Sequence, residues 1–347
     1  MNKIRKAASN PFIATAASLV VLLVVVVYSG FSGVIDLSPS QVMAHLIGGE
    51  TLSAREQAVF FDIRLPRIVT AMIVGSMLAL SGAAYQAVFR NPLADPYLLG
   101  VSAGAGLGVT VVIVGGTVLG LSAGGFSIIG AAFIGGITAV SATVMVSRGV
   151  GQGSSTTVVI LAGVAVAAFA SSIQTYIQQR NIDTVARIYV WMLGSLNVSR
   201  WESVISVALP TVICAALILA SARVLDVMTV GDVEARTLGI DPTVVRLSLV
   251  AVATLGTASV VAISGLIGFV GIIVPHAIRL ICGPGHRMLL PLTLVWGAIF
   301  LVTADTIGRT ILAPQELPVG VVTAAVGAPF FLFILRRSSR PRKEATA

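Results

Sequence analysis

Long apolar intervals free of charge alternate with short charged segments along the whole chain. An α-helix needs about 20 residues to cross the hydrocarbon core of a bilayer, so each interval predicts at least one crossing. The interval 96–147 is too long for one crossing and breaks at the glycine-rich stretch 115–125. The interval 247–278 breaks near Ser264–Gly265–Leu266. The pattern predicts an all-α integral membrane protein of about ten helices, forming one domain over residues 1–347, with helices in the intervals 7–35, 68–89, 96–147, 149–179, 203–222, 247–278, 288–304 and 317–335.

Composition agrees with a bilayer protein. Hydrophobic residues make up 56% of the chain and charged residues 10%, whereas a soluble domain carries about 25% charged residues. Thirty-five glycines favour close packing of helix on helix without large side chains. The first apolar run, 11–30, is long enough to span and precedes no clear signal-peptidase site, so we expect a retained helix.

The distribution of basic residues predicts the orientation. An even number of helices places both termini on one side of the membrane. Fifteen of the 22 lysines and arginines then fall on that side, which the positive-inside rule identifies as cytoplasmic. The segments 31–66 and 178–201 become the sizeable outer loops. The seven basic residues on the outer side are Arg55, Arg64, Arg67, Arg180, Arg187, Arg200 and Arg309.

One charged island, Arg223 to Arg246, interrupts the apolar pattern on the predicted cytoplasmic side. Gly231–Asp232 offers a helix N-cap, and Gly239 is a natural C-terminal stop. Asp241–Pro242 then starts a second helix, with aspartate as the cap and proline at the first helical position. A simple connector needs only a few residues. The island therefore predicts a docking element of short helices over about 226–243, although an ordinary polar loop is the alternative.

Several chemistries are disfavoured. The chain has no phosphate-binding loop and only three lysines, at positions 3, 6 and 343, so ATP hydrolysis would need a separate chain. His45, His276 and His286 lie far apart, so no metal site is predicted. Scattered basic residues at helix ends do not indicate nucleic acid. Few ionisable residues fall at mid-membrane, which disfavours an ion-coupled secondary transporter. That rival and a membrane scaffold without transport remain alternatives.

Several motifs together resemble the FecCD-type permeases, the membrane subunits of ABC importers for iron–siderophores, haem and cobalamin. The resemblance covers essentially residues 60–337, in order and with conventional spacing. The matching stretches are Arg64-Leu-Pro-Arg67, Gly82, Asn91-Pro-Leu-Ala-Asp-Pro96, Leu99-Gly-Val-Ser-Ala-Gly-Ala-Gly106, Leu161-Ala-Gly-Val164, Gly265-Leu-Ile-Gly-Phe-Val-Gly271 with Pro275, His276 and Arg279, Asp305 to Arg309, Glu316-Leu-Pro-Val-Gly-Val-Val-Thr323, and Gly327-Ala-Pro329.

The resemblance implies the type II ABC importer fold, in which two permease subunits surround a central pathway. Two cytoplasmic ATPase subunits, which carry ATP and Mg, and an outer substrate-binding protein complete the transporter. The permease itself is then no enzyme and binds no cofactor. It would be a multi-pass protein of the cytoplasmic membrane, in contact with lipid and with both termini inside. We expect an iron complex, siderophore or haem, as cargo, with cobalamin as the alternative. Homodimer and paired paralogue remain open, as does the Gram type of the host.

The resemblance also implies site residues. Three outer arginines would meet carboxylates of the binding protein, although they could simply anchor helices, and Arg309 could pair with Asp305 four residues before it. The island would couple to the ATPase through a Glu-Ala loop in which Arg236 replaces an alanine. The docking residues are Arg64, Arg67 and Arg309, and the coupling residues are Asp232, Glu234, Ala235, Arg236, Leu238 and Gly239.

A cytoplasmic gate and a pathway lining follow in the same way. The gate residues could equally be helix caps and turn residues, and the lining face could equally pack on neighbouring helices. The fifth span is apolar until its outer end, and such a lining suits a bulky ligand. The gate residues are Asn91, Leu93, Thr156 and Thr157, and the lining residues are Val158, Leu161, Ala165 and Ser172.

Overall fold

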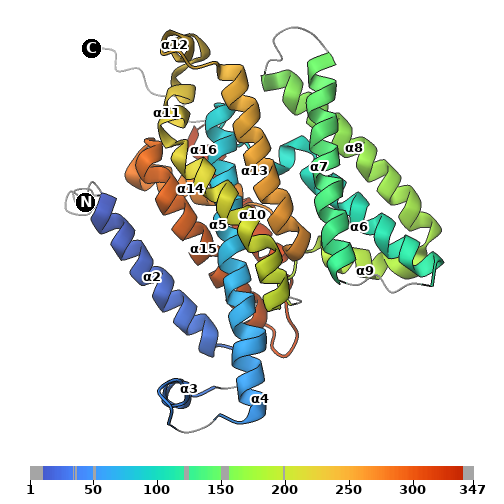
Figure 1. The fold of residues 1–347 in the computed structure, drawn as a ribbon, viewed down its shortest axis with the longest axis vertical. Coiled ribbons are helices and arrows are strands. Elements are labelled where there is room, and N and C mark those ends of the chain that lie inside the picture. The colour runs from blue at the N-terminus through green and yellow to red at the C-terminus, as the bar shows by residue number, and fades with distance from the viewer. Residues whose placement is uncertain are drawn as a thin grey trace.

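The computed structural model describes residues 11–33, 35, 37–49, 52–120, 125–149, 156–197 and 200–338. Helices account for nearly all of them (Figure 1). The elements are α2 (Pro11–Phe31), α3 (Pro39–Leu46), α4 (Ala54–Gln57), the π-helix η1 (Ala58–Arg64), α5 (Leu65–Val88), the 3-10 helix η2 (Pro96–Leu99), α6 (Val101–Val118), α7 (Gly125–Gly149), α8 (Thr156–Arg180), α9 (Ile182–Met192), α10 (Trp201–Ala220), α11 (Ala222–Val230), α12 (Asp232–Thr237), α13 (Pro242–Ser264), α14 (Val270–Cys282), α15 (His286–Thr310) and α16 (Val319–Ser338).

The predicted spans are confirmed within the described residues. Eight helices are long and apolar enough to cross a membrane, and α14 and α16 are shorter apolar helices. Both predicted breaks exist, between α6 and α7 and between α13 and α14. The second break begins at Gly265, which has a φ of 67°. A Cβ there would lie 2.1 Å from the carbonyl oxygen of Trp191, so only glycine fits.

The predicted outer loops are more ordered than the sequence indicates. The segment 31–66 contains α3, α4 and η1, and the last two continue directly into α5 as one helical run, Ala54–Val88. A capping box between Ser53 and Glu56 starts this run, since each residue accepts a hydrogen bond from the backbone N–H of the other. The segment 178–201 contains α9. Charged residues in both segments interrupt the apolar pattern without interrupting the helices.

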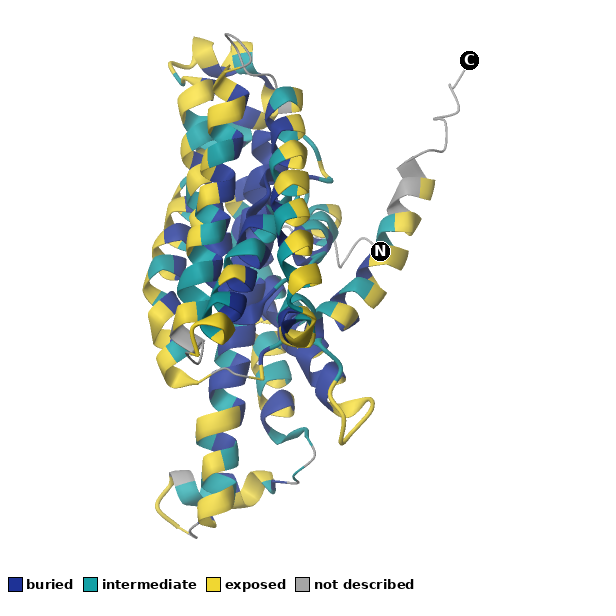
Figure 2. Ribbon diagram, turned by 90° about the vertical axis from the view of Figure 1, so that its right-hand side faces the viewer, coloured by how far each residue is buried: buried dark blue, intermediate teal, exposed yellow. Residues whose placement is uncertain are grey.

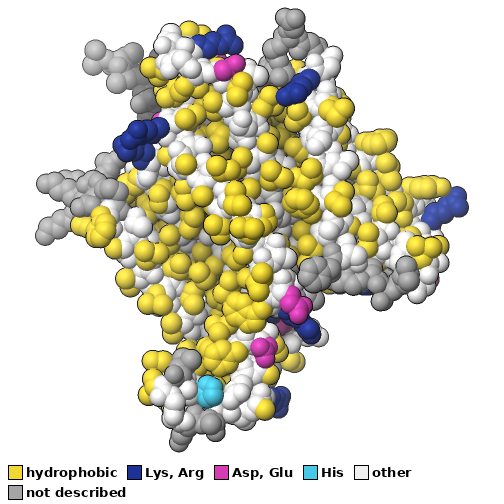
Figure 3. Space-filling model, viewed as in Figure 1, with side chains coloured by type: hydrophobic (Ala, Val, Ile, Leu, Met, Phe, Trp, Pro, Cys, Tyr) yellow, Lys and Arg dark blue, Asp and Glu magenta, His cyan; other side chains and the backbone are white. Residues whose placement is uncertain are grey.

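Helix α5 runs through the centre of the bundle and is mostly buried (Figures 1 and 2). It packs against α13, α14 and α15, while α6, α7, α8 and α9 form a group to one side. Helices α11 and α12 lie at one end of the molecule, and α3 and α4 lie at the other. Hydrophobic side chains cover the body between these ends, and charged side chains gather toward them (Figure 3).

Backbone contacts between glycines hold α5 against two of its neighbours. A Cβ on Gly75 would lie 2.2 Å from the carbonyl oxygen of Gly297 in α15. A Cβ on Gly82 would lie 2.0 Å from the carbonyl oxygen of Gly271 in α14. Real Cβ atoms do not approach this closely, so these helices meet where neither carries a side chain.

Candidate functional site

The charged island folds into α11, α12 and the start of α13, and it forms one tip of the molecule (Figure 1). Gly239 ends α12 with a φ of 76°. Its N–H donates to the carbonyl of Arg236, and the N–H of Ile240 donates to the carbonyl of Ala235, which is the Schellman pattern. Asp241 caps α13 by accepting from the N–H of Thr243 at 2.8 Å. The predicted stop and restart are therefore confirmed.

Asp232 does not cap α12 as the sequence suggested. Gly231 occupies the N-cap position, and Asp232 is the first helical residue. Its carboxylate instead pairs with Arg90 at 2.6 Å and with Arg246 at 3.1 Å. These partners lie just after α5 and in the first turns of α13, so Asp232 ties the tip to two of the most buried helices. Arg90 has a φ of 49°, a conformation uncommon outside glycine.

The surface of the tip is apolar with a charged surround. The side chains of Val233 and Leu238 are 71% and 66% exposed, and Val230 is similarly open. Ala235 is fully buried beneath them, whereas Glu234 and Arg236 are exposed. Exposed apolar side chains at a charged tip are typical of a protein interface.

A second contact fixes α11 to the bundle. The carboxylate of Asp226 accepts from the backbone N–H of His286 at 2.8 Å and lies 2.7 Å from Nδ1 of the same residue. Next to this contact is a hollow of about 280 Å³, lined in part by Arg90, Arg279 and Asn91. Arg279 donates to Gln86 at 3.0 Å, so α14 and α5 are joined at the same level.

The predicted gate residues lie at the same end as the tip. The side chain of Asn91 accepts from the N–H of Leu93 at 2.9 Å, which closes the turn after α5. Leu93 is half-buried. Thr157 is exposed in the first turn of α8, and the side chain of Thr156 lies outside the described residues. The turn role considered for Asn91 is therefore present, and a gating role stays a prediction.

Asp95, which follows this turn, makes the stability of the fold depend on pH. Burial raises the pKa of its carboxyl to about 6, against the opposing hydrogen bond from the Tyr97 N–H. A carboxyl with a raised folded-state pKa favours folding at low pH, and this contribution is lost as the pH rises from the ordinary pKa of 3.8 to about 6. We expect Asp95→Asn, which keeps the acceptor without the charge, to raise the thermal unfolding midpoint at pH about 7.5 and to leave it nearly unchanged at pH about 4. An equal shift at both pH values would contradict this.

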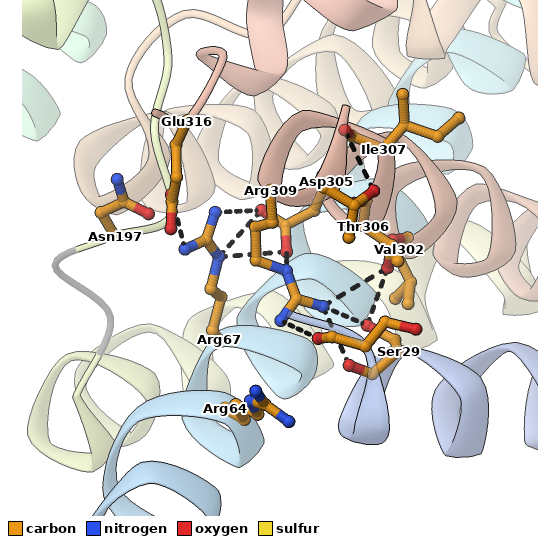
Figure 4. A network of polar contacts seen from close by, with 12 residues as sticks. Ser29, Arg64, Arg67, Asn197, Val302, Asp305, Thr306, Ile307, Arg309 and Glu316 are labelled. Atoms are coloured by element: carbon orange, nitrogen blue, oxygen red, sulfur yellow. Dashed lines mark hydrogen bonds and ion pairs between the residues drawn. The ribbon is translucent and has the colours of Figure 1, made fainter. Parts of the chain in front are cut away.

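The opposite end carries a buried ion-pair network (Figure 4). Arg67 in α5 donates through Nε to both carboxylate oxygens of Asp305 in α15, at 2.9 and 3.0 Å. Its NH1 donates to Glu316 at 2.9 Å, in the loop before α16. Arg67 and Asp305 are 8% and 2% exposed, whereas the side chain of Glu316 is 32% exposed. The only solvent-facing member of this trio is thus Glu316.

Arg309 connects the network to α2, and Arg64 contacts the end of α2 separately. Nε of Arg309 lies 3.2 Å from Asp305, and its NH2 donates to the hydroxyl of Ser29 at 2.7 Å. Arg64 donates to the backbone carbonyls of Gly30, at 2.9 Å, and Ile35. The local pair of Arg309 with Asp305 considered from the sequence is present. All three predicted docking arginines are buried and bonded within the subunit.

The predicted lining residues share one face of α8. Val158, Leu161, Ala165 and Ser172 follow one another at spacings of three, four and seven, which places them on one stripe of the helix. Val158 is half-buried and the other three are exposed. No charged residue lies between Val158 and Gln179. The hydroxyl of Ser172 bonds to the carbonyl of Ala168 at 2.8 Å, so the face is smooth and weakly polar.

Together these features define a polytopic helical membrane protein with an exposed apolar tip at one end and a buried ion-pair network at the other. The chain belongs to the FecCD transport family, whose model matches residues 21–337. It is therefore the non-catalytic permease subunit of an ABC importer, a multi-pass protein of the cell membrane that works with an ATPase and a binding protein.

Named relatives cover most of the chain. The cobalamin import system permease protein BtuC of Halobacterium salinarum is 41% identical over 284 residues, which are 81% of this chain and 74% of that protein. The hemin transport system permease protein HmuU of Yersinia pestis is 39% identical over 290 residues, 82% of this chain and 85% of that one. A solved metal-chelate type ABC transporter in an inward-facing conformation aligns with a TM-score of 0.83 and 29% identity, covering 94% of this chain and 100% of that one.

Sequence reasoning missed the ion pairs between helices distant in the sequence, of which two are the clearest examples. The Arg67–Asp305 pair joins residues 238 positions apart, and Arg90 with Asp232 joins residues 142 apart. A usable signal did exist, because each pair combines opposite charges at span ends predicted to lie on the same side of the membrane. Matching opposite charges that lie at the same predicted depth in the membrane would have predicted both contacts.

Proposed function

We propose that this permease imports a bulky metal chelate, an iron–siderophore or haem, across the cytoplasmic membrane. The α12 tip faces the cytoplasm and receives the ATPase, and the Arg67 network faces outward. The observation that carries the ATP-driven part of this proposal is the tip itself. Its exposed Val233 and Leu238 offer an apolar contact, and Asp232 links that contact to α5 and α13 through two ion pairs. Movement of the ATPase can therefore reach the centre of the bundle.

The exposed face of α8 supports a pathway between two permease subunits. It is uncharged and carries small side chains at Ala165, Ala168 and Ser172. A ligand delivered by a binding protein needs few attachment points along such a path, because tight sites would slow its release. We propose a dimer, of identical or paralogous chains, with two ATPase subunits. Cobalamin is the second candidate cargo, since cobalamin and hemin permeases are similarly identical to this chain.

The test is reconstitution of the permease with its ATPase and binding protein in proteoliposomes. Uptake and ATP hydrolysis are measured with ferric siderophores, haem and cobalamin as separate substrates. We expect one metal chelate to stimulate both activities, and we expect no uptake without ATP. Uptake driven by an ion gradient without the ATPase would refute the proposal, as would ATP hydrolysis that no chelate stimulates.

We further propose that the binding protein docks by placing a carboxylate of its own on Arg67 in place of the Glu316 carboxylate. Asp305 occupies Nε and NH2 of Arg67 in the interior, so only NH1 is directed toward the outer loop. Glu316 already occupies NH1 at 2.9 Å, yet its side chain is 32% exposed. A glutamate of the binding protein can reach this guanidinium by displacing Glu316. The side chain of Arg67 is 9% exposed and that of Glu316 is 32% exposed. Because Glu316 is partly in solvent, the pair contributes close to the roughly 0–1 kcal/mol of a surface pair, so displacement is feasible.

The exchange predicts an unusual gain of affinity. Glu316→Gln weakens the internal competitor and leaves the buried Arg67–Asp305 pair in place. We expect the binding protein to bind this variant up to about fivefold more tightly, measured by surface plasmon resonance on nanodisc-embedded importer. Glu202→Gln, which removes an exposed charge at the start of α10, is the matched control and should not change the affinity. Equal affinities for both variants, or weaker binding of Glu316→Gln, would refute the exchange.

A further inference from the structure

A groove of about 570 Å³ runs between α7 and α13, two helices that pack against each other (Figure 1). Its walls are apolar along most of their length, with Ile137 and Val144 on α7 and Leu255 on α13. One end of the groove is polar. Arg148 in the last turn of α7 and Ser248 near the start of α13 line it there. Both side chains are exposed, and this end lies on the same side of the molecule as the α12 tip.

The dimensions of the groove match one leaflet of a bilayer. On α7 it extends from Ile137 to Arg148, which corresponds to about 16 Å at about 1.5 Å per residue. Half of a hydrocarbon core about 30 Å thick is about 15 Å. A lipid acyl chain lying in the groove would therefore place its headgroup beside Arg148. The surrounding face is hydrophobic between its charged ends (Figure 3), as a lipid-facing surface must be.

The positive charge of Arg148 at the mouth of the groove favours lipids with anionic headgroups. Within the part of the chain that the structure describes, Arg148 has no ion-pair or hydrogen-bond partner. The adjoining residues 150–155 contain no carboxylate in the sequence. Arg246, which directly precedes the groove residue Leu247, is already paired with Asp232. A guanidinium beside an apolar groove between transmembrane helices is complementary to a phosphate headgroup.

We propose that the α7–α13 groove binds an anionic phospholipid, with one acyl chain between the two helices and the phosphate on Arg148. The hydroxyl of Ser248 lies at the same end and can donate a second hydrogen bond to the headgroup. The site is separate from the α12 tip, from the Arg67 network and from the exposed face of α8. The proposal requires only that the chain lies in a membrane, and it does not depend on which cargo the importer carries.

The test measures lipid retained by the purified importer complex. Detergent-solubilised complex is incubated with phosphatidylglycerol or phosphatidylcholine, and bound lipid is counted by native mass spectrometry. We expect Arg148→Gln to retain about tenfold less phosphatidylglycerol. The loss of phosphatidylcholine should be smaller, because its choline cation offsets the charge of its phosphate. Arg223→Gln, which removes an exposed arginine of α11 at the same end of the molecule, is the charge-matched control and should retain both lipids.

A second variant tests the groove itself. Ala251 lines it and is exposed, so Ala251→Trp fills the space without entering the core. We expect this variant to lose both lipids from the site and to keep its melting temperature, whereas Leu209→Trp on the exposed face of α10 should lose neither. Retention of phosphatidylglycerol by Arg148→Gln at the level of Arg223→Gln would overturn the proposal. A disulfide between two copies carrying Met145→Cys would also overturn it, by showing that a protein chain covers the groove.

Discussion

A permease carrying Val233→Asp and Leu238→Asp is expected to assemble in the membrane and to lose its ATPase. Val233 in α12 and Leu238 at its C-cap are both exposed, so their replacement leaves the fold intact. Burying each of them at an interface contributes about 1.5–3 kcal/mol, and carboxylates there would have to be desolvated. We expect association at least about 100-fold weaker, read as loss of ATPase co-purification and of ATP-driven uptake.

The matched control keeps the apolar character of the same two positions. Val233→Ile combined with Leu238→Met should retain the ATPase at the normal level. Two more disruptive changes test whether α12 and its packing are required for ATPase binding. Deletion of 231–240 removes α12, and Ala235→Trp forces a large side chain into a fully buried site, so both should also abolish association. Normal co-purification of the aspartate variant, or of the deletion, would show that the ATPase docks elsewhere.

Asp305→Ala is expected to cause the largest loss of stability of any single change at the opposite end. Asp305 is 2% exposed and stands between the guanidiniums of Arg67 and Arg309. Its removal leaves two buried cations facing each other with only Glu316 nearby. Breaking a buried ion pair from one side costs about 3–5 kcal/mol. We expect a clear fall in the thermal unfolding midpoint in detergent and a low yield of monodisperse protein.

Comparing Asp305→Ala with Glu316→Gln separates the effect of burial from the effect of losing a charge. Glu316→Gln removes a carboxylate from the same network, but its side chain is partly in solvent, so its cost should stay below about 1 kcal/mol. Adding Arg309→Met to Asp305→Ala removes one of the stranded cations and should recover part of the loss. If Asp305→Ala costs no more than Glu316→Gln, the network does not stabilise the fold.

The spans could be predicted from the sequence because a crossing helix must avoid charge along its whole length. The same rule explains why the charged start of a helical run at the end opposite the tip was not predicted. The helical run Ala54–Val88 contains Arg55, Asp62 and Arg64, so the apolar pattern begins only after its first turns. A helix that projects beyond the hydrocarbon has no hydropathy signature. Its start is marked only by the Ser53 capping box, which is a weak signal in isolation.

Some features of the candidate sites could be predicted from the sequence and others could not. Caps and stops depend on neighbouring residues, so Gly239 and Asp241 could be assigned from the sequence. Ion pairs depend on which helices meet, and hydropathy contains no information on helix neighbours. Asp232 was therefore expected to act as a cap, whereas its carboxylate bonds to Arg90 and Arg246. The burial of the three outer arginines was hidden for the same reason.

The glycine contacts of α5 limit how this chain can vary. At Gly75 and Gly82 the opposing atoms are backbone carbonyls of Gly297 and Gly271, which cannot rotate away as a side chain can. Even alanine would force the helices apart, and no compensating change in the partner side chain is available because the partner has none. A comprehensive substitution library should therefore find Gly75, Gly82 and Gly297 closed to all 19 alternatives. Gly271 should be less strictly closed, because a Cβ there would lie 3.0 Å from the carbonyl oxygen of Leu78. In a hydropathy profile each of these positions reads as an ordinary small residue.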